Sequence, residues 1–217
     1  MIKPKGLKIG DTLGVVAPAS PTTKDKVDLA YKKLNQMGFK VIMGKSCYSN
    51  YGYLAGSDDL RAEDLNTMFK NQEIDGIICL RGGYGTPRIL DLLDYKLIKE
   101  NPKVFIGYSD ITALHIAFNQ LSNLITFHGP MAASDLIGEF SDFSKESLLN
   151  SIMEGEYQFA IKDSLGKILT INGGIAEGPI IGGNLSLITS TIGTPYEIDT
   201  KGKILFIEEI GEEPLDF

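Results

Sequence analysis

Short apolar runs alternate with helical periods over the first two-thirds of the chain. Five runs of four to six residues have the length and the Val, Ile, Leu and Phe content of strands; they lie at residues 12–17, 39–43, 75–80, 103–108 and 124–127. Between them, apolar residues recur every three or four positions, as on the buried face of a helix. Strands that are apolar on both faces and alternate with helices predict a parallel sheet covered by helices on both sides, of the flavodoxin or Rossmann type.

Several helix starts are marked by capping residues. Ser57 precedes a helical period whose first turn holds two aspartates, which favour the positive end of the helix dipole. Thr86 and Pro87 are the expected cap and first residue of a later helix. Asn184 is the expected cap of a short helix near the end of the chain.

The pattern changes after a helix that ends near Gly155. Short strands are predicted at residues 157–161, 168–171 and 203–208, and glycines are dense from residue 166 to residue 183. The chain reaches Phe217 where another helix is expected to begin. We therefore expect an α/β domain over residues 1–160 and an incomplete, smaller, β-rich domain over residues 165–217.

Charge and composition narrow the class of protein. The 21 Lys and Arg residues against 28 Asp and Glu give a net charge of −7 and a pI near 4.9, which argues against nucleic acid or an anionic membrane as the main partner. No apolar run approaches the roughly 18 residues that cross a bilayer, and residues 1–6 are not followed by the apolar segment of a signal peptide. Two cysteines form no disulfide framework or metal motif. These features predict a soluble, intracellular protein in a reducing compartment.

One candidate for chemistry is Ser109, at the corner where the fourth predicted strand enters a helix. A serine on such a sharp turn projects outward, and the N–H of Asp110 points from the helix start toward an oxyanion formed on attack. Ile111 stands where the usual elbow pattern has a second glycine. The tetrapeptide at residues 107–110, taken alone, favours the alternative that Ser109 or Asp110 simply caps the helix.

A second candidate is the glycine loop at residues 81–85, which follows the third predicted strand. Gly82 and Gly83 permit positive φ angles and a close approach of the backbone, so their N–H groups are available to an anion. Arg81 is suited to binding a carboxylate with two hydrogen bonds. A tight turn between strand and helix explains the glycines equally well. The phosphate-loop lysine is absent.

The histidines and the late acidic pair are weaker candidates. His115 lies six positions after Ser109 on a helix and points away from the corner, which favours a packed or surface role over that of a base. His128 ends the fifth predicted strand, where it either lines the pocket or stabilises its own loop. Glu208 and Glu209 end a strand and face opposite sides. As an isolated pair they are best explained as a solvated strand end.

Taken together, seven ordered segments resemble the LD-carboxypeptidase family of serine peptidases, which also contains the microcin C immunity peptidases. The matching segments are residues 13–20, 55–66, 81–85, 105–114, 126–131, 182–187 and 205–209. They span nearly the whole chain, so that together they are far more specific than any one motif.

The resemblance implies a Ser-His-Glu triad with Ser109 as nucleophile and Glu208, in the first acidic position of its motif, as the acid. It also implies an oxyanion hole from the N–H groups of Asp110 and of Gly82 or Gly83. Beside these lie the remaining candidates for substrate binding, which are Arg81, Tyr84 and His128. Family members are cytoplasmic homodimers without a metal or cofactor. Their usual substrate is a murein tetrapeptide that loses its terminal D-alanine in peptidoglycan recycling.

The resemblance also implies a departure, because the family's catalytic histidine lies beyond the acid and residues 209–217 contain none. The expectation is a C-terminally truncated chain that is hydrolytically crippled, since a serine without a base is a poor nucleophile. Three alternatives remain open: a microcin C-type immunity peptidase that cleaves peptidyl-nucleotides, a peptide-binding protein without catalysis, and a nucleotide- or phosphate-binding module. The net charge and the missing phosphate-loop lysine count against the third.

Overall fold

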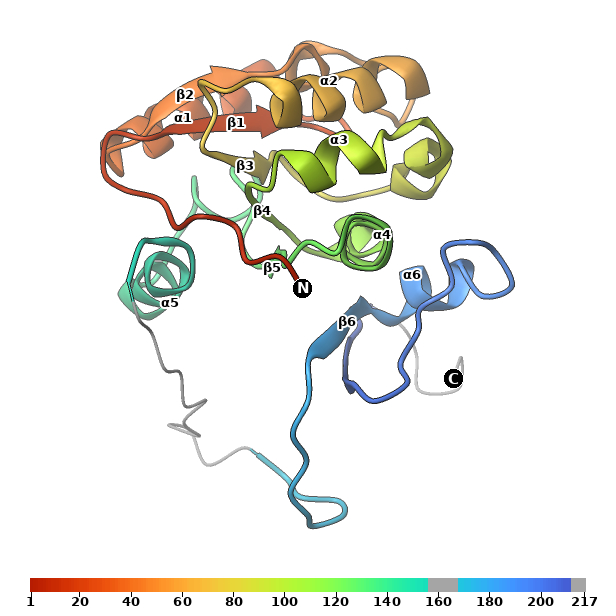
Figure 1. The fold of residues 1–217 in the computed structure, drawn as a ribbon. Helices are drawn as coiled ribbons and strands as arrows, with labels where there is room; N and C mark the ends of the chain where they lie inside the picture. The colour runs from red at the N-terminus through yellow and green to blue at the C-terminus, as the bar shows by residue number, and fades with distance from the viewer. Residues whose placement is uncertain (156–167, 212–217) are drawn as a thin grey trace.

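Five parallel strands form the central sheet of the protein (Figure 1). The computed structural model describes residues 1–155 and 168–211. The strands are β1 (Thr12–Val16), β2 (Lys40–Met43), β3 (Gly76–Cys79), β4 (Val104–Gly107) and β5 (Phe127–His128). They pair in parallel in the order β2-β1-β3-β4-β5, which is the flavodoxin-like order. The predicted α/β fold is confirmed.

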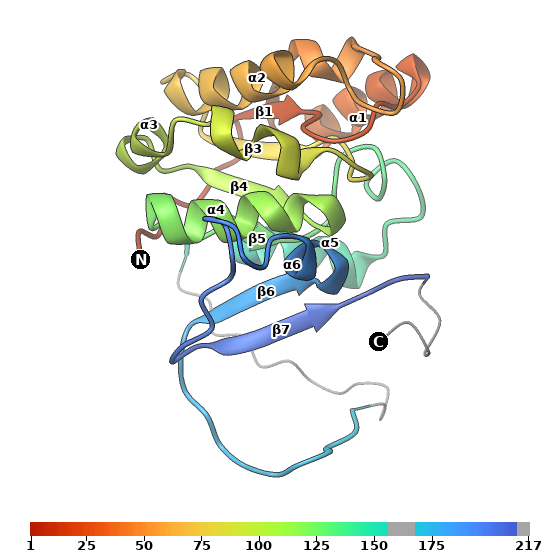
Figure 2. The same ribbon diagram turned by 90° about the vertical axis from the view of Figure 1, so that its right-hand side faces the viewer.

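Helices cover both faces of this sheet (Figure 2). On one face lie α1 (Lys24–Gln36) and α5 (Asp142–Ile152); on the other lie α2 (Asp58–Lys70), α3 (Tyr95–Glu100), α4 (Thr112–Ser122) and the 3-10 helix η2 (Thr86–Leu92). Two further 3-10 turns are η1 (Lys45–Tyr48) and η3 (Ser109–Ile111). Within the described ranges, no helix combines the length and the apolar character that crossing a membrane requires.

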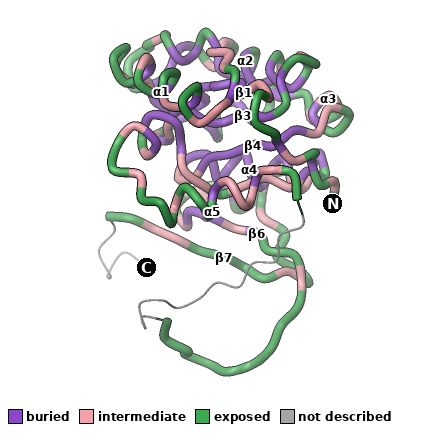
Figure 3. Tube along the Cα trace, turned by 90° about the vertical axis from the view of Figure 1, so that its left-hand side faces the viewer, coloured by how far each residue is buried: buried purple, intermediate pink, exposed green. Residues whose placement is uncertain are grey.

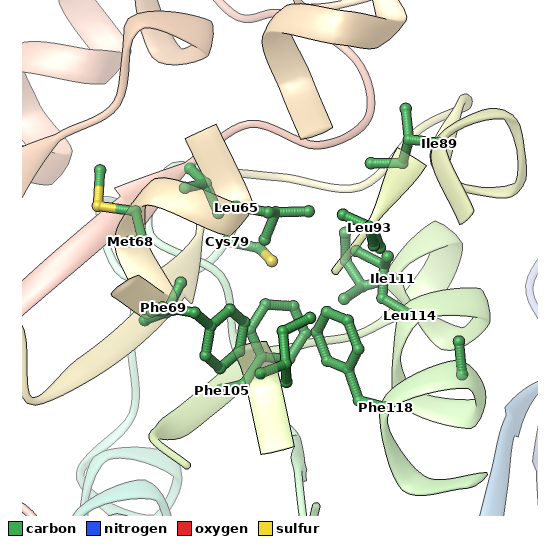
Figure 4. Packing of buried hydrophobic residues seen from close by; sticks show 14 of the residues in the cluster. Leu65, Met68, Phe69, Cys79, Ile89, Leu93, Phe105, Ile111, Leu114 and Phe118 are labelled. Atoms are coloured by element: carbon green, nitrogen blue, oxygen red, sulfur yellow. The ribbon is translucent and has the colours of Figure 1, made fainter. Parts of the chain in front are cut away.

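An aromatic cluster fills the space between β4, α2 and α4 (Figure 4). The rings of Phe105 and Phe118 meet edge to face at 4.9 Å between centroids, and Phe69 meets Phe118 in the same way at 5.4 Å. Such pairs contribute about 0.5–1.5 kcal/mol each beyond the burial of their area. This core therefore fixes β4 and α4, the strand and the helix on either side of Ser109, relative to each other.

A second unit follows, made of β6 (Ile180–Asn184), α6 (Leu185–Ser190) and β7 (Ile204–Glu208). Its two strands pair in parallel, with Asn184 opposite Glu208. The unit lies against α4 (Figure 2), where the backbone N–H of Asn184 donates to Thr112 Oγ1 at 3.0 Å. The outer strand β7 is largely exposed along its length (Figure 3).

Several predicted boundaries differ from those in the structure. The fifth strand is shifted, because Leu124 bridges to Ile2 and pairing with β4 begins only at Phe127. The cap of η2 is Gly85 rather than Thr86, whose polar groups bond to Asp110 instead. Asn184 caps α6 as predicted, with its side chain accepting from the N–H of Leu187.

The predictions for the later part of the chain are less accurate than those for the central sheet. The strand predicted at residues 168–171 is wrong, because these residues are exposed and have no strand conformation in the described chain. The strand predicted at 157–161 lies outside the described residues, and so does the predicted boundary between 160 and 165. Strand β6 was not predicted because Gly182 and Gly183 are poor strand formers. Both glycines are required, since a Cβ on Gly182 would collide with the Phe206 carbonyl oxygen and a Cβ on Gly183 would collide with Thr112.

Candidate active site

Ser109 occupies a strained corner between β4 and α4. Its φ is +62°, a left-handed conformation that costs a serine about 1–3 kcal/mol. Among the described residues only Asn123 shares a positive φ without being glycine, and Asn123 is an ordinary left-handed helix terminus. Ser109 is half-buried rather than sealed inside the fold. A strained and partly accessible serine at this turn is the geometry of a nucleophile elbow.

The alternative that Ser109 or Asp110 caps the following helix does not describe this structure. Neither side chain accepts a hydrogen bond at the start of η3 or α4. The Asp110 carboxylate turns away and accepts the N–H of Thr86 at 2.9 Å. Burial raises the pKa of Asp110 to about 6. The two residues therefore serve purposes other than capping.

The glycine loop lies directly against the elbow. A Cβ on Gly82 would stand 3.2 Å from Ser109 Oγ, so a larger residue would crowd the hydroxyl. Gly83 has φ +118°, and a Cβ there would collide with Ser20. Ser20 braces the loop, because its Oγ accepts from the N–H of Tyr84 at 3.1 Å and its N–H donates to the Gly82 carbonyl at 3.4 Å.

Three backbone N–H groups of the elbow and the glycine loop donate no hydrogen bond to another described residue. They belong to Gly82, Gly83 and Asp110, of which Gly82 and Asp110 are buried, and they are called the open amides below. Free amides beside a serine hydroxyl are what an oxyanion hole requires. The structure thus brings Ser109 together with the glycine loop, whose residues lie 24 to 28 positions before it in the sequence.

Arg81 and Tyr84 lie at the two ends of the glycine pair. The Arg81 guanidinium donates from Nε to the Gly82 carbonyl and from Nη1 to the Pro21 carbonyl, both at 3.2 Å. These bonds hold the side chain over the loop and leave Nη2 for another acceptor. Tyr84 is 72% exposed, and its ring meets Tyr53 edge-on with 6.4 Å between centroids. Both residues can reach a ligand at the rim.

The two late glutamates have different surroundings. The carboxylate of Glu209 accepts from Asn184 Nδ2 at 2.8 Å and from the hydroxyl and N–H of Ser186 at 2.6 and 2.9 Å. The Ser186 hydroxyl is the main cause that lowers the pKa of Glu209 to about 2. Glu209 is therefore engaged in holding α6 to the end of β7.

Glu208 differs at one of its two carboxylate oxygens. Among the described residues, its buried Oε1 has no hydrogen-bond partner, and it lies 4.0 Å from His128 Nε2, which is too long for a hydrogen bond. Burial, together with the charge of Glu209, raises the pKa of Glu208. A buried acceptor oxygen without a donor suits a carboxylate that orients a histidine, because that task needs an unoccupied oxygen.

The two histidines of the chain lie beside each other, with ring centroids 6.1 Å apart. His115 is buried, with its ring nitrogens 2.8 Å from Thr126 Oγ1 and from the Gly107 carbonyl, and burial lowers its pKa to about 4. It is a packed residue, as predicted. His128 contacts the rings of Tyr108 and Phe206, and burial lowers its pKa.

His128 also borders three cavities. One, of about 480 Å³, runs from Tyr108 past Pro130 to Phe140. A second, of about 390 Å³, lies between α4 and the β6–β7 strands. A third, also of about 390 Å³, lies between the end of β5 and α5. In the part of the chain that the structure describes, no three His, Cys, Asp or Glu side chains converge as a metal site.

Sequence reasoning overlooked Arg61, which is fully buried beneath the glycine loop. The sequence did contain a signal for its burial. Arg61 lies on the same face of α2 as Leu65 and Met68, where a charged side chain among apolar residues is unusual. Thr86 was interpreted only as a cap, although its hydroxyl donates to the Asp110 carbonyl.

Comparison with known proteins agrees with this geometry. Residues 13–129 match the LD-carboxypeptidase N-terminal domain and residues 177–217 match the LD-carboxypeptidase C-terminal domain. A probable murein peptide carboxypeptidase of Bacillus subtilis is 47% identical over 98% of this chain and 66% of its own length. The chain spans about two thirds of the length of the curated relatives it matches.

Solved structures give the same assignment. An MccF-like protein from Bacillus anthracis superposes with a TM-score of 0.84 at 30% identity, over 96% of this chain and 70% of the other. A muramoyltetrapeptide carboxypeptidase from Oxalobacter formigenes superposes with a TM-score of 0.80 at 28% identity, over 94% of this chain and 67% of the other. With two matched domains and these relatives, the chain belongs to the LD-carboxypeptidase family.

Proposed function

We propose that the protein is a serine-type carboxypeptidase that removes the terminal D-alanine from murein tetrapeptide. The observation that supports this most is the left-handed Ser109 beside the open amides of the glycine loop. Family membership and the 47% identical relative named as a probable murein peptide carboxypeptidase support the substrate class. The MccF-like relatives support the alternative of a peptidyl-nucleotide substrate at lower identity.

In the proposed reaction, Ser109 Oγ attacks the carbonyl carbon of the L,D bond. Its proton passes to the triad base, a histidine that the family resemblance assigns to a segment after the acidic pair, and Glu208 orients that imidazole. The C–N bond then breaks, and the base gives the proton to the D-alanine amine. Water hydrolyses the acyl-serine ester by the same base, which restores the hydroxyl.

The oxyanion of each tetrahedral intermediate is proposed to bind to the N–H groups of Asp110 and of Gly82 or Gly83. A donor of this kind contributes roughly 3–4 kcal/mol in comparable sites. Arg81 is proposed to bind the terminal carboxylate of the substrate through its remaining N–H groups. Tyr84 and His128 are proposed to line the substrate site from the loop and from the end of β5.

The physiological setting is part of the proposal. We infer a cytoplasmic homodimer that needs no metal or cofactor, takes a small peptide as its substrate and acts in peptidoglycan recycling. The acidic net charge supports a small peptide over a nucleic acid or a membrane as partner.

The test is turnover of purified murein tetrapeptide by the intact protein. The expected products are the tripeptide and one equivalent of D-alanine, detected by mass spectrometry and by a D-amino-acid oxidase assay. Ser109→Ala is expected to release none, and a tetrapeptide that ends in L-alanine is the stereochemical control. Cleavage of aspartyl sulfamoyl adenosine without cleavage of tetrapeptide would favour the alternative substrate class. Binding of tetrapeptide without turnover would reject the enzyme in favour of a binding protein.

A further inference from the structure

We propose that Arg61, Thr86 and the Asp110 side chain form a buried clamp that fixes the glycine loop against the Ser109 elbow. In this role they are positioning residues, since none of the three side chains touches the reacting atoms. The inference rests on the proposed function, because it explains how the Gly82 and Gly83 amides are aimed.

The first half of the clamp is the guanidinium of Arg61. Its Nη1 donates to the Pro18 carbonyl at 2.5 Å and to the Gly85 carbonyl at 2.9 Å. Pro18 follows β1 and Gly85 ends the glycine loop after β3, so one side chain joins the loops of two neighbouring strands. Asp58, held in turn by Arg88 at 2.7 Å, pairs with the other end of the guanidinium.

Gly85 is shaped for this contact. Its φ is +126°, and a Cβ there would lie 2.8 Å from Arg61 Nη1 and 2.6 Å from Leu54 Cδ2. Only glycine permits both the backbone conformation and the close approach of the guanidinium. The third glycine of the loop therefore serves the clamp rather than the substrate.

The second half joins the next residue, Thr86, to the elbow. Its N–H donates to Asp110 Oδ2 at 2.9 Å, and its hydroxyl donates to the Asp110 carbonyl oxygen. Thr86 is fully buried and Asp110 is 2% exposed, so water does not compete for these bonds. Asp110 follows Ser109 directly and carries one of the open amides. The loop is thus bonded at two points to the residue beside the nucleophile.

Stability alone is a poor explanation for Arg61. Its buried Nε has no hydrogen-bond partner among the residues that the structure describes, and burial lowers the pKa of Arg61 despite the neighbouring Asp58. An incompletely satisfied buried charge costs free energy that an apolar residue would not. What Arg61 provides is geometry, because it holds two carbonyls in a fixed relation, and preorganised donors are what oxyanion stabilisation depends on.

The test compares Thr86→Val with Thr86→Ser in the intact protein. The valine variant loses the bond from the hydroxyl to Asp110 at nearly constant shape, and kcat for tetrapeptide is expected to fall about 10- to 100-fold, with KM within about twofold. The serine variant is expected to restore most of kcat. Arg61→Lys has one nitrogen where arginine uses Nη1 for the two carbonyls and Nη2 for Asp58, and it is expected to follow the valine variant.

Met68→Ala, which removes a buried side chain from the far end of α2, is the control for lost stability and is expected to keep kcat. Wild-type kcat in Thr86→Val, or an equal loss in Met68→Ala, would overturn the clamp. Labelling by a fluorophosphonate separates this failure from that of the proposed function. If the wild type does not label at Ser109, the proposed function fails; if wild type and Thr86→Val label at the same rate, the clamp fails.

Discussion

The two units of the molecule hold their candidate catalytic residues in opposite ways. Ser109 lies at the carboxyl end of β4 in the five-stranded sheet. The loops at this end are joined by hydrogen bonds from or to Ser20, Arg61 and Thr86. Glu208 lies at the end of β7, a strand whose residues are mostly exposed (Figure 3). In the first unit, the rigid surroundings hold Ser109 in its left-handed backbone conformation, which would relax in a flexible loop.

The second unit shows the same contrast on a smaller scale, between two adjacent residues. Glu209 satisfies its carboxylate with donors from α6, whereas Glu208 keeps a buried oxygen without a partner. Under the proposed function, this difference assigns a structural role to Glu209 and the role of the triad acid to Glu208.

The largest expected effect tests this contrast between the glutamates. Glu208→Gln is expected to lower kcat for tetrapeptide by roughly 10³- to 10⁴-fold, because the amide no longer orients a charged imidazole. Glu209→Gln keeps most of its acceptor geometry and is expected to stay within about tenfold of wild type. Steady-state kinetics on both variants decides the matter. A larger loss in Glu209→Gln would exchange the two roles.

Arg81→Ala is expected to raise KM by about 10- to 100-fold with a smaller change in kcat, since a hydrogen bond to a charged group contributes about 1.5–3 kcal/mol. Lys96→Ala, which removes an exposed cation on α3, outside the loop and the clamp, is the control. KM values from D-alanine release check the effect. An unchanged KM in Arg81→Ala would remove Arg81 from substrate binding.

Asp110→Asn is expected to change how stability depends on pH. Burial raises the pKa of Asp110 to about 6, above its ordinary 3.8, so the folded protein binds this proton more tightly than the unfolded chain. The contribution of Asp110 to the unfolding free energy therefore falls as pH rises from about 4 to about 6. Asparagine does not titrate, so the variant should gain on the order of 2 kcal/mol relative to wild type between pH ~4 and pH ~7. Urea unfolding at both pH values measures this, and a constant difference would contradict it.

The smallest effect concerns strain at the elbow. Ser109→Gly relieves the positive φ, whereas Ser109→Ala retains it, so the glycine variant is expected to be more stable than the alanine variant by about 1 kcal/mol. Both are expected to be inactive. Thermal unfolding of the pair measures the difference, and an alanine variant of equal or greater stability would argue against strain at this corner.

Much of the fold was predictable because buried parallel strands carry a strong signal. The runs around Val15, Ile78 and Phe105 are apolar on both faces, and the helices between them show clear periods. The β6–β7 unit was harder, because Gly182 and Gly183 meet the needs of a close backbone approach rather than of strand propensity. Local propensity does not reveal such contacts.

The candidate site was predictable in its parts but not in its connections. Ser109 and Gly82 are visible as loop residues after strands, and the family resemblance added Glu208. The tie from Thr86 to Asp110 depends on the packing of loops from neighbouring strands, and the free oxygen of Glu208 depends on which donors Glu209 captures. Both are products of tertiary structure.

The central claim is that the Ser109 hydroxyl is the attacking group. The direct measurement is labelling of the intact protein with a fluorophosphonate, followed by peptide mapping. The account predicts a single adduct on Ser109 that disappears in Ser109→Ala while the variant stays folded by circular dichroism. Equal labelling of wild type and Ser109→Ala, or an adduct on another serine, would contradict it.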